Sequence, residues 1–223
     1  YWDGATILDA TADGARNLYT AARTTSTRLS FTTSNVGNSA LQDTMMTTNQ
    51  STLANVIAWV RSARFGVGNT GIALSKMGSV ESATPSILTR PARPSWYAHG
   101  TSADRTRVDN FVALNASRVP LLMFGAKDGM IHALYTRPID ISNPINGREA
   151  WAFIPPKIAS GMLADYTSSM SGTTTVASYP DGSPTLADWH AGNGVMKTTA
   201  IVASGNGGKS ITALDVTRSI DPS

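Results

Sequence analysis

Two pairs of acidic and imidazole side chains are the groups in this 223-residue sequence whose spacing could support chemistry. Asp128 and His132 are four positions apart, and Asp188 and His190 are two apart. A carboxylate beside an imidazole can act in acid–base catalysis or bind a metal if further groups converge on it. A strand would place Asp188 and His190 on one face, which makes them the best candidate polar pair. Asp128 instead suits a hairpin turn, and we expect His132 to pack or cap rather than bind a metal.

A glycine-rich run at residues 205–210, GNGGKS, looks like the end of a phosphate-binding loop. The full pattern requires a glycine five positions before the last glycine, where Ala203 stands, and it requires a helix to follow. The next residues, ITALDV, predict a strand, so we interpret the run as a hairpin turn. The sequence also has no GxSxG or HExxH motif. We therefore expect no enzymatic activity and no catalytic, cofactor-binding or metal-binding residues.

The composition favours a turn-rich β protein. Charged residues make up only 15% of the chain, which contains 19 glycines and 11 prolines. The absence of cysteine excludes disulfides and thiol chemistry. The net charge of +3 comes from scattered basic residues, which indicates a solvated surface rather than a nucleic-acid-binding one. No stretch approaches the ~18 apolar residues of a membrane span. The chain begins without methionine or a signal peptide, as an excised or processed piece would.

Residues 1–83 are predicted to form a lead-in segment with short strands and one helix. Residues 16–21 and 28–32 have the β-branched and aromatic content of strands. Residues 49–64 predict an amphipathic helix, because apolar side chains recur at i, i+3, i+4 and i+7. Asn49 or Ser51 could cap its start, and glycines at positions 66 and 68 would end it.

Two long segments are expected to lie on the surface. Residues 89–118 are rich in Arg, Pro, Ser and Asp and predict a long loop, and residues 157–181 are long and polar. Binding functions commonly reside in such loops on a rigid scaffold.

An internal repeat predicts the fold. MIHALYTR at residues 130–137 resembles SITALDVTR at 210–218, and each follows an apolar strand and a glycine-containing turn. The first unit is expected to have four strands and the second three, after which the chain stops. We expect the first unit's strands at residues 84–88, 121–124, 130–135 and 149–154, and the second unit's at 184–189, 198–203 and 210–215.

A repeated four-stranded meander is typical of a β-propeller. We therefore predict a mainly β fold, with residues 84–223 as the first blades of an incomplete propeller. This part would hold about one full four-stranded blade plus part of the next. Two similar hairpins within a β-sandwich are the alternative.

Four ordered motifs resemble the C-terminal propeller of the PilY1/PilC family of type IV pilus proteins. They are GAKDGMIHAL (125–134), EAWAFIPP (149–156), YPDGSPTLAD (179–188) and ITALDVT (211–217). The residues that carry the resemblance are Gly125, Asp128, Gly129, Met130, His132, Trp151, Phe153, Pro155, Asp181, Gly182, Ser183, Pro184, Asp188, Leu214 and Asp215.

The sequence departs from the family pattern at several points. Lys127 stands where asparagine is common, and residues 79–82 (SVES) replace the usual approach to the first motif. Members of the family can bind calcium through an Asp-rich loop in a later blade. No D-x-[DN]-x-[DN]-G run exists here, so the resemblance implies no cofactor in this chain and possible calcium elsewhere in the full-length protein.

The resemblance implies a non-enzymatic protein of the type IV pilus, or fimbrium. It would be secreted to the periplasm or cell surface and act at the pilus tip in pilus assembly, twitching motility and adhesion. Its partners would be minor and major pilins or other tip proteins, and a host or abiotic surface. A quinoprotein (PQQ) dehydrogenase-like propeller is the enzymatic alternative, and a structural propeller of an outer-membrane assembly factor is a third reading.

Overall fold

Two antiparallel meanders form the frame of the protein. The structure is a computed structural model that describes residues 2–62, 75–137, 142–171, 177–220 and 222. In both meanders, strands that follow one another in the sequence are hydrogen-bonded neighbours in the sheet. The first meander consists of β3 (Ser86–Leu88), β4 (Leu121–Gly125), β5 (Ile131–Tyr135) and β6 (Glu149–Phe153). The second consists of β7 (Thr185–His190), β8 (Met196–Ala203) and β9 (Ile211–Asp215). The expected strands and their pairing order are thereby confirmed.

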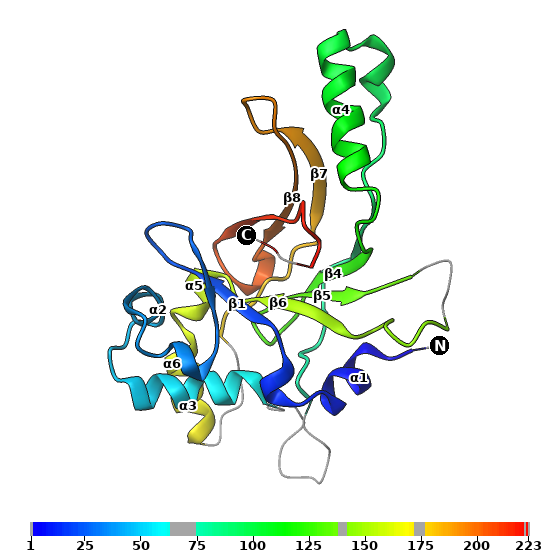
Figure 1. Ribbon diagram of the computed structural model, residues 1–223. Coiled ribbons are helices and arrows are strands. Elements are labelled where there is room, and N and C mark those ends of the chain that lie inside the picture. Colours follow the sequence, from blue (N-terminus) through cyan, green and yellow to red (C-terminus); the bar gives the residue numbers. More distant parts are fainter. Residues whose placement is uncertain (1, 63–74, 138–141, 172–176, 221, 223) are drawn as a thin grey trace.

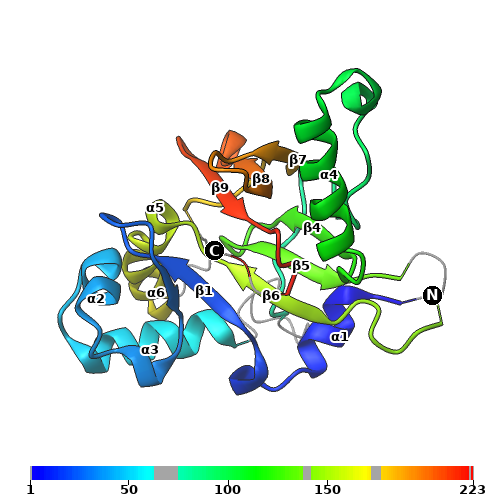
Figure 2. The ribbon, with the colours of Figure 1, turned by 45° about the horizontal axis from the view of Figure 1, so that its top comes forward.

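The N-terminal strands extend the first meander. β1 (Leu18–Ala21) pairs in parallel with β6, and β2 (Arg28–Ser30) pairs antiparallel with β1. The result is a six-stranded sheet in the order β2-β1-β6-β5-β4-β3 (Figure 2). The expected strands near residues 16–21 and 28–32 therefore form, and they lie in the same sheet as the first expected blade. The proposed boundary at residue 83 stays a prediction.

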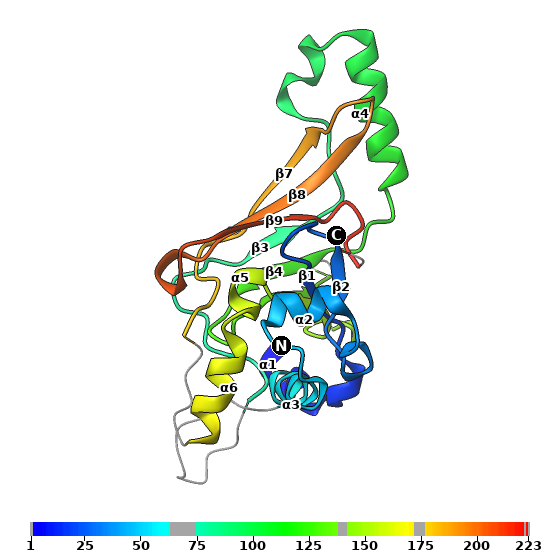
Figure 3. The same cartoon turned by 90° about the vertical axis from the view of Figure 1, so that its left-hand side faces the viewer.

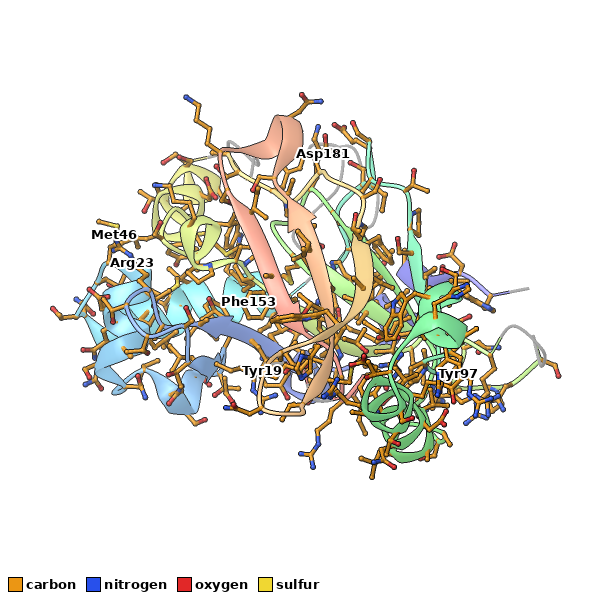
Figure 4. All side chains as sticks on the ribbon, turned by 90° about the horizontal axis from the view of Figure 1, so that it is seen from above. Tyr19, Arg23, Met46, Tyr97, Phe153 and Asp181 are labelled. Atoms are coloured by element: carbon orange, nitrogen blue, oxygen red, sulfur yellow. The ribbon has the colours of Figure 1, made fainter. Side chains whose placement is uncertain are left out.

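Three layers stack on one another (Figure 3). The second meander packs on one face of the six-stranded sheet, and helices pack on the other. Tyr19 of β1 and Phe153 of β6 are register partners on the face toward the second meander (Figure 4). The helices on the opposite face are α2 (Ser39–Met45), α3 (Gln50–Arg61), α5 (Pro156–Ala159) and α6 (Met162–Met170). The N-terminal helix is α1 (Gly4–Ala10), and the short 3-10 turns are η1 (Asp13–Ala15), η2 (Thr33–Asn35), η3 (Ser95–His99) and η4 (Gly205–Gly207).

The amphipathic helix expected at residues 49–64 is α3. Its apolar stripe at positions 53, 56, 57 and 60 is fully buried in the helical layer. Asn49 is the N-cap, because its side chain accepts a hydrogen bond from the Thr52 N–H at 2.9 Å. The helix ends at Arg61. Residues 63 and 64 and the glycines at 66 and 68 lie outside the described residues.

The prediction of a long loop at residues 89–118 is wrong. This segment contains η3 and a 13-residue helix, α4 (Ser102–Leu114), which projects from the body beside the β7–β8 hairpin (Figure 1). Thr101 and Asp104 form a reciprocal capping box at its start. The helix buries only Val108 and Phe111. A helix that buries so few side chains needs few apolar residues, so its sequence shows little apolar periodicity. This polarity is why the helix was missed.

The fold is mixed α/β rather than mainly β. Helices cover one sheet face, and α6 and most of α5 lie within residues 157–181, the segment expected to be long, polar and on the surface. The two sheets are separate, and neither closes on itself. Among the residues described, no helix has both the length and the apolar character that crossing a bilayer requires.

Trp151 is the largest side chain that is fully buried between the sheets, and it tests this packing. Its indole N–H donates to the Ser219 carbonyl at 2.6 Å. Trp151→Phe removes that hydrogen bond and leaves a cavity, so we expect it to lower the free energy of unfolding by about 2 kcal/mol. Urea unfolding measures the loss. Trp96→Phe, at a half-exposed position, is the matched control and should change stability by less than about 0.5 kcal/mol.

Candidate functional site

A buried chain of charged groups crosses the helix-facing side of the sheet. His132 of β5 lies between two carboxylates: its Nε2 is 2.8 Å from Asp128 Oδ2, and its Nδ1 is 2.9 Å from Glu149 Oε1. Both side-chain partners are acceptors, so both ring nitrogens donate and the imidazole is protonated. The ring of Phe124 stacks on the imidazole at 5.4 Å between centroids. The histidine and both carboxylates are almost completely shielded from solvent.

Backbone N–H groups also donate to both carboxylate oxygens of Asp128. Its Oδ2 accepts from the Gly78 N–H and its Oδ1 from the Met130 N–H, both at 2.9 Å. The carboxylate thereby closes the β4–β5 turn, in which Gly129 has a φ of +88°. The Asp-Gly turn expected from the sequence is confirmed, and its aspartate has the additional role of binding the histidine.

Arg16 completes the chain of charges from the N-terminal segment. Its guanidinium donates to both oxygens of Glu149 at 2.9 Å, which is a bidentate pair. Arg61, at the end of α3, donates to the carbonyls of Asp13, Phe31 and Arg16. The buried charge cluster, defined as Arg16, Arg61, Asp128, His132 and Glu149, thus joins five separate parts of the chain.

Attraction to charged neighbours outweighs the cost of burial for His132 and Glu149. Burial alone would lower the pKa of His132, but Asp128 and then Glu149 raise it to about 9. Burial would likewise raise the pKa of Glu149, but hydrogen bonds and charge from His132 and Arg16 lower it to about 2. His132 and Glu149 are therefore both ionised across the neutral range, and each has an oppositely charged partner inside the protein.

The geometry of this cluster is that of a structural element. Each carboxylate is occupied by donors of the protein itself, and the side chains are covered by the sheet and helices. In the described ranges, no three or more His, Asp or Glu side chains are grouped so that they could hold a metal. The cluster can therefore fix the position of β5 and β6.

The Asp-Gly-Ser-Pro motif fastens the two meanders together. Asp181 Oδ1 accepts from the Ser82 N–H at 3.0 Å, and Ser183 Oγ accepts from the Thr84 N–H at 2.9 Å. The Ser86 hydroxyl donates to the Pro184 carbonyl at 2.5 Å. The motif lies immediately before β7, and it binds the segment that leads into β3, the first strand of the first meander.

Glycines allow the backbones to meet at this junction. A Cβ atom at Gly125 would lie 2.1 Å from the Pro180 carbonyl oxygen, and one at Gly207 would lie 2.0 Å from that of Tyr179. A Cβ at Gly182 would lie 2.7 Å from the Ala203 carbonyl oxygen. These contacts explain why glycine, which lacks a Cβ, occupies these three positions, of which Gly125 and Gly182 belong to the motifs.

The structure does not bring Asp188 and His190 together as a site. Asp188 Oδ1 accepts from the Thr198 hydroxyl at 2.5 Å, and Thr198 in turn accepts from Arg118 at 2.6 Å. His190 lies exposed at the end of β7. Asp215 pairs with Lys197 at 2.8 Å. Partial burial would raise the pKa of Asp215, but Lys197 and Thr217 hold it below its usual value.

The apolar motif residues form the core. Trp151, Phe153 and Leu214 are buried between the sheets, and Met130 is buried in the helical layer. Pro155 is buried at the start of α5. The motifs therefore describe packing and turns rather than a catalytic centre.

Two departures from the family pattern pair with each other. Lys127 Nζ lies 2.6 Å from Glu81 Oε1, and the lysine also lies over the Tyr179 ring. Both charged side chains are about two-fifths exposed, so the pair contributes little to stability.

Sequence reasoning missed Arg16, Arg61 and Glu149 as members of the cluster. They lie far apart in the sequence and have no motif in common. The one available signal was that each lies at the end of an apolar strand or helix, where a charged side chain can be buried only with a partner.

Comparisons with known proteins give two matches. No family model matches the chain. A curated protein of Xylella fastidiosa (strain Temecula1), described as a type IV pilus biogenesis factor PilY1 homolog, is 30% identical over 197 residues, covering 86% of this chain and 14% of that protein. The chain thus spans a small part of that relative's length. Among solved structures, the Pseudomonas aeruginosa PilY1 C-terminal domain has a TM-score of 0.39 and 25% sequence identity, covering 64% of this chain and 24% of that one.

The cluster predicts a characteristic dependence of stability on pH. The contribution of His132 is fully present below its ordinary pKa of 6.5 and is lost as the pH rises through about 9. The contribution of Glu149 is present above 4.5 and is lost as the pH falls through about 2. The free energy of unfolding should therefore fall by roughly 2–3 kcal/mol between pH 6.5 and 9.5, as measured by urea unfolding.

Two variants test whether His132 causes this loss of stability at alkaline pH. His132→Gln removes the titrating group, so its stability should be lower at pH 6 and nearly flat up to pH 9.5. His190→Gln changes an exposed histidine and should retain the decline of the unmodified protein. An equal decline in His132→Gln and the unmodified protein would show that another group is responsible.

Adding one methyl group at Gly125 tests the close contact at the junction of the meanders. Gly125→Ala places a Cβ against the Pro180 backbone and should lower the free energy of unfolding by about 1–3 kcal/mol. Gly37→Ala, where a Cβ meets nothing within 4 Å, is the control. Thermal denaturation of the two variants compares them, and equal melting temperatures would argue against the close contact.

Proposed function

We propose, from the premise that this chain belongs to the PilY1-like family, that it is a non-enzymatic part of a longer protein that serves type IV pilus biogenesis. The observation that carries the proposal is the similarity over 197 residues to a protein described as a type IV pilus biogenesis factor. The proposed location is the periplasm and cell surface, with action at the pilus tip in assembly and surface or host-cell attachment. Pilins, minor or major, or other tip proteins are the proposed partners.

The two meanders are proposed to be neighbouring blades of a propeller. Adjacent propeller blades stack through their apolar faces and are connected in sequence order. Here β3–β6 and β7–β9 are sequential antiparallel meanders whose apolar faces pack together. Contacts between the β7 motif and the segment leading into β3 hold the pair. The remaining blades are proposed to come from parts of the longer protein that this chain does not span.

The buried charge cluster supports a scaffold role in this proposal. It resembles neither a cofactor site nor an acid–base site, because its side chains bind one another beneath the surface. A quinoprotein-like activity therefore gains no support from it. The possible calcium site of the family is proposed to lie in another blade.

The proposal is tested in a bacterium that carries the full-length gene. Deletion of the gene should reduce surface pili and twitching, and the wild-type gene in trans should restore both. Electron microscopy counts the pili, and the width of the twitching zone measures motility.

Two single-residue alleles link the result to this part of the protein. The Gly37→Ala allele should restore piliation, whereas Gly125→Ala should restore it poorly because the junction of the meanders is strained. Immunoblots report the amount of each protein. Unchanged piliation and attachment after gene deletion would refute the proposed function.

A further inference from the structure

Residues 89–118 carry the net charge of the protein. This segment, which we call the basic arm, contains five arginines and two aspartates and thus has a net charge of +3 with histidine neutral. The whole chain also has a net charge of +3, so the remaining residues are neutral in sum. The basic residues are scattered along the sequence, so this concentration of positive charge forms no run there. It becomes a surface feature because the arm projects from the body (Figure 1).

Internal contacts hold the arm in one shape. Arg93 pairs with Asp109 of α4 at 2.8 Å and lies over the ring of Tyr97, whose hydroxyl donates to the same carboxylate at 2.6 Å. The capping box of Thr101 and Asp104 fixes the start of the helix. These contacts reduce the conformational entropy that the arm would lose on binding a partner.

Other arginines of the arm remain available to a partner. Arg90 donates to the Ala116 carbonyl and Arg105 to the Gly100 carbonyl, and within the described part of the chain neither forms an ion pair. Arg90, Arg93 and Arg118 also line a groove of about 380 Å3 between the arm and β7. Asp188 also lines this groove, and Arg93 and Arg118 already have partners within the protein. The exposed Arg90 is the arginine of the groove that remains for an acidic group from outside.

Exposed apolar side chains accompany these charges. Trp96 is 47% exposed and Leu114 is 83% exposed, although both belong to an ordered part of the arm. Tryptophan, tyrosine and arginine are the residue types enriched at the energetic centres of protein–protein interfaces. Trp96 and Leu114 are thus apolar side chains of the arm that lie within reach of a partner.

We propose that the basic arm is a docking site for an acidic protein surface. Arginine pairs with carboxylates in a planar, bidentate geometry, and the arm uses arginine throughout and contains no lysine. An anionic membrane or nucleic acid would be bound mainly through net charge. The exposed Trp96 adds an apolar anchor that fits a protein partner better. This inference does not depend on the proposed pilus function.

Binding of the purified chain to immobilised acidic polypeptides tests the proposal. The probes are poly-L-glutamate and a random copolymer of glutamate and tyrosine, measured by surface plasmon resonance. The chain should bind both, more tightly at low salt, and should favour the copolymer. Arg90→Glu with Arg105→Glu should weaken binding about tenfold or more, and Trp96→Ala should remove the preference for the copolymer.

A matched pair of substitutions controls for net charge. Arg23→Glu with Lys209→Glu reverses two exposed basic residues outside the arm, and Arg23 lies far from Tyr97 of the arm (Figure 4). This variant should bind like the unmodified chain, and circular dichroism should show all variants folded. Equal weakening by both double variants would overturn the proposal. Tighter binding to phosphatidylglycerol vesicles or to double-stranded DNA than to the polypeptides would also overturn it.

Discussion

The buried charge cluster is the constraint on which the first sheet depends. Transfer of an ion from water to a protein interior costs several kcal/mol unless partners compensate it. Here one imidazolium, two carboxylates and the Arg16 guanidinium must meet at once, because the absence of any one leaves another uncompensated. Arg61 adds hydrogen bonds to backbone carbonyls beside them. Their donors and acceptors come from the N-terminal segment, α3, the β4–β5 turn, β5 and β6. The cluster therefore selects a single arrangement of these elements.

The parallel pairing of β1 with β6 follows from the same constraint. Arg16 lies two residues before β1, and Glu149 is the first residue of β6, so their bidentate pair holds β1 in the register that places Leu18 beside Ala152. The Asn17 side chain and the β1 backbone then bind β6 along its length. Helices α2, α3, α5 and α6 cover this side of the sheet and exclude water from the charges.

The opposite face of the sheet is held by packing rather than by charge. Trp151, Phe153 and their neighbours meet apolar residues of β8 and β9, while glycines let the connecting segments come into contact. The family motifs map onto this packing and onto its turns. Packing and turns of this kind build a scaffold, and the surface outside them, including the basic arm, is free for recognition.

The sequence by itself determined the elements that depend on local patterns. The strands of both meanders, the Asp-Gly turn and α3 with its Asn49 cap follow from alternation, turn chemistry and helical periodicity, which neighbouring residues encode. Helix α4 was not predicted because it has few apolar positions. Its capping box was the one local signal of a helix in the sequence. For the candidate site, the sequence singled out Asp128 and His132, and it also favoured Asp188 with His190.

Only the tertiary structure decided which distant groups meet. Glu149 lies 133 positions from Arg16 and 17 from His132, and no local pattern links the three. Asp188 binds Thr198 of the neighbouring strand rather than His190 of its own, because side chains across an antiparallel pair are closer than alternate ones along a strand. The cost of burying an unpaired charge, which exists only once the chain is compact, selects the partners of Arg16, His132 and Glu149.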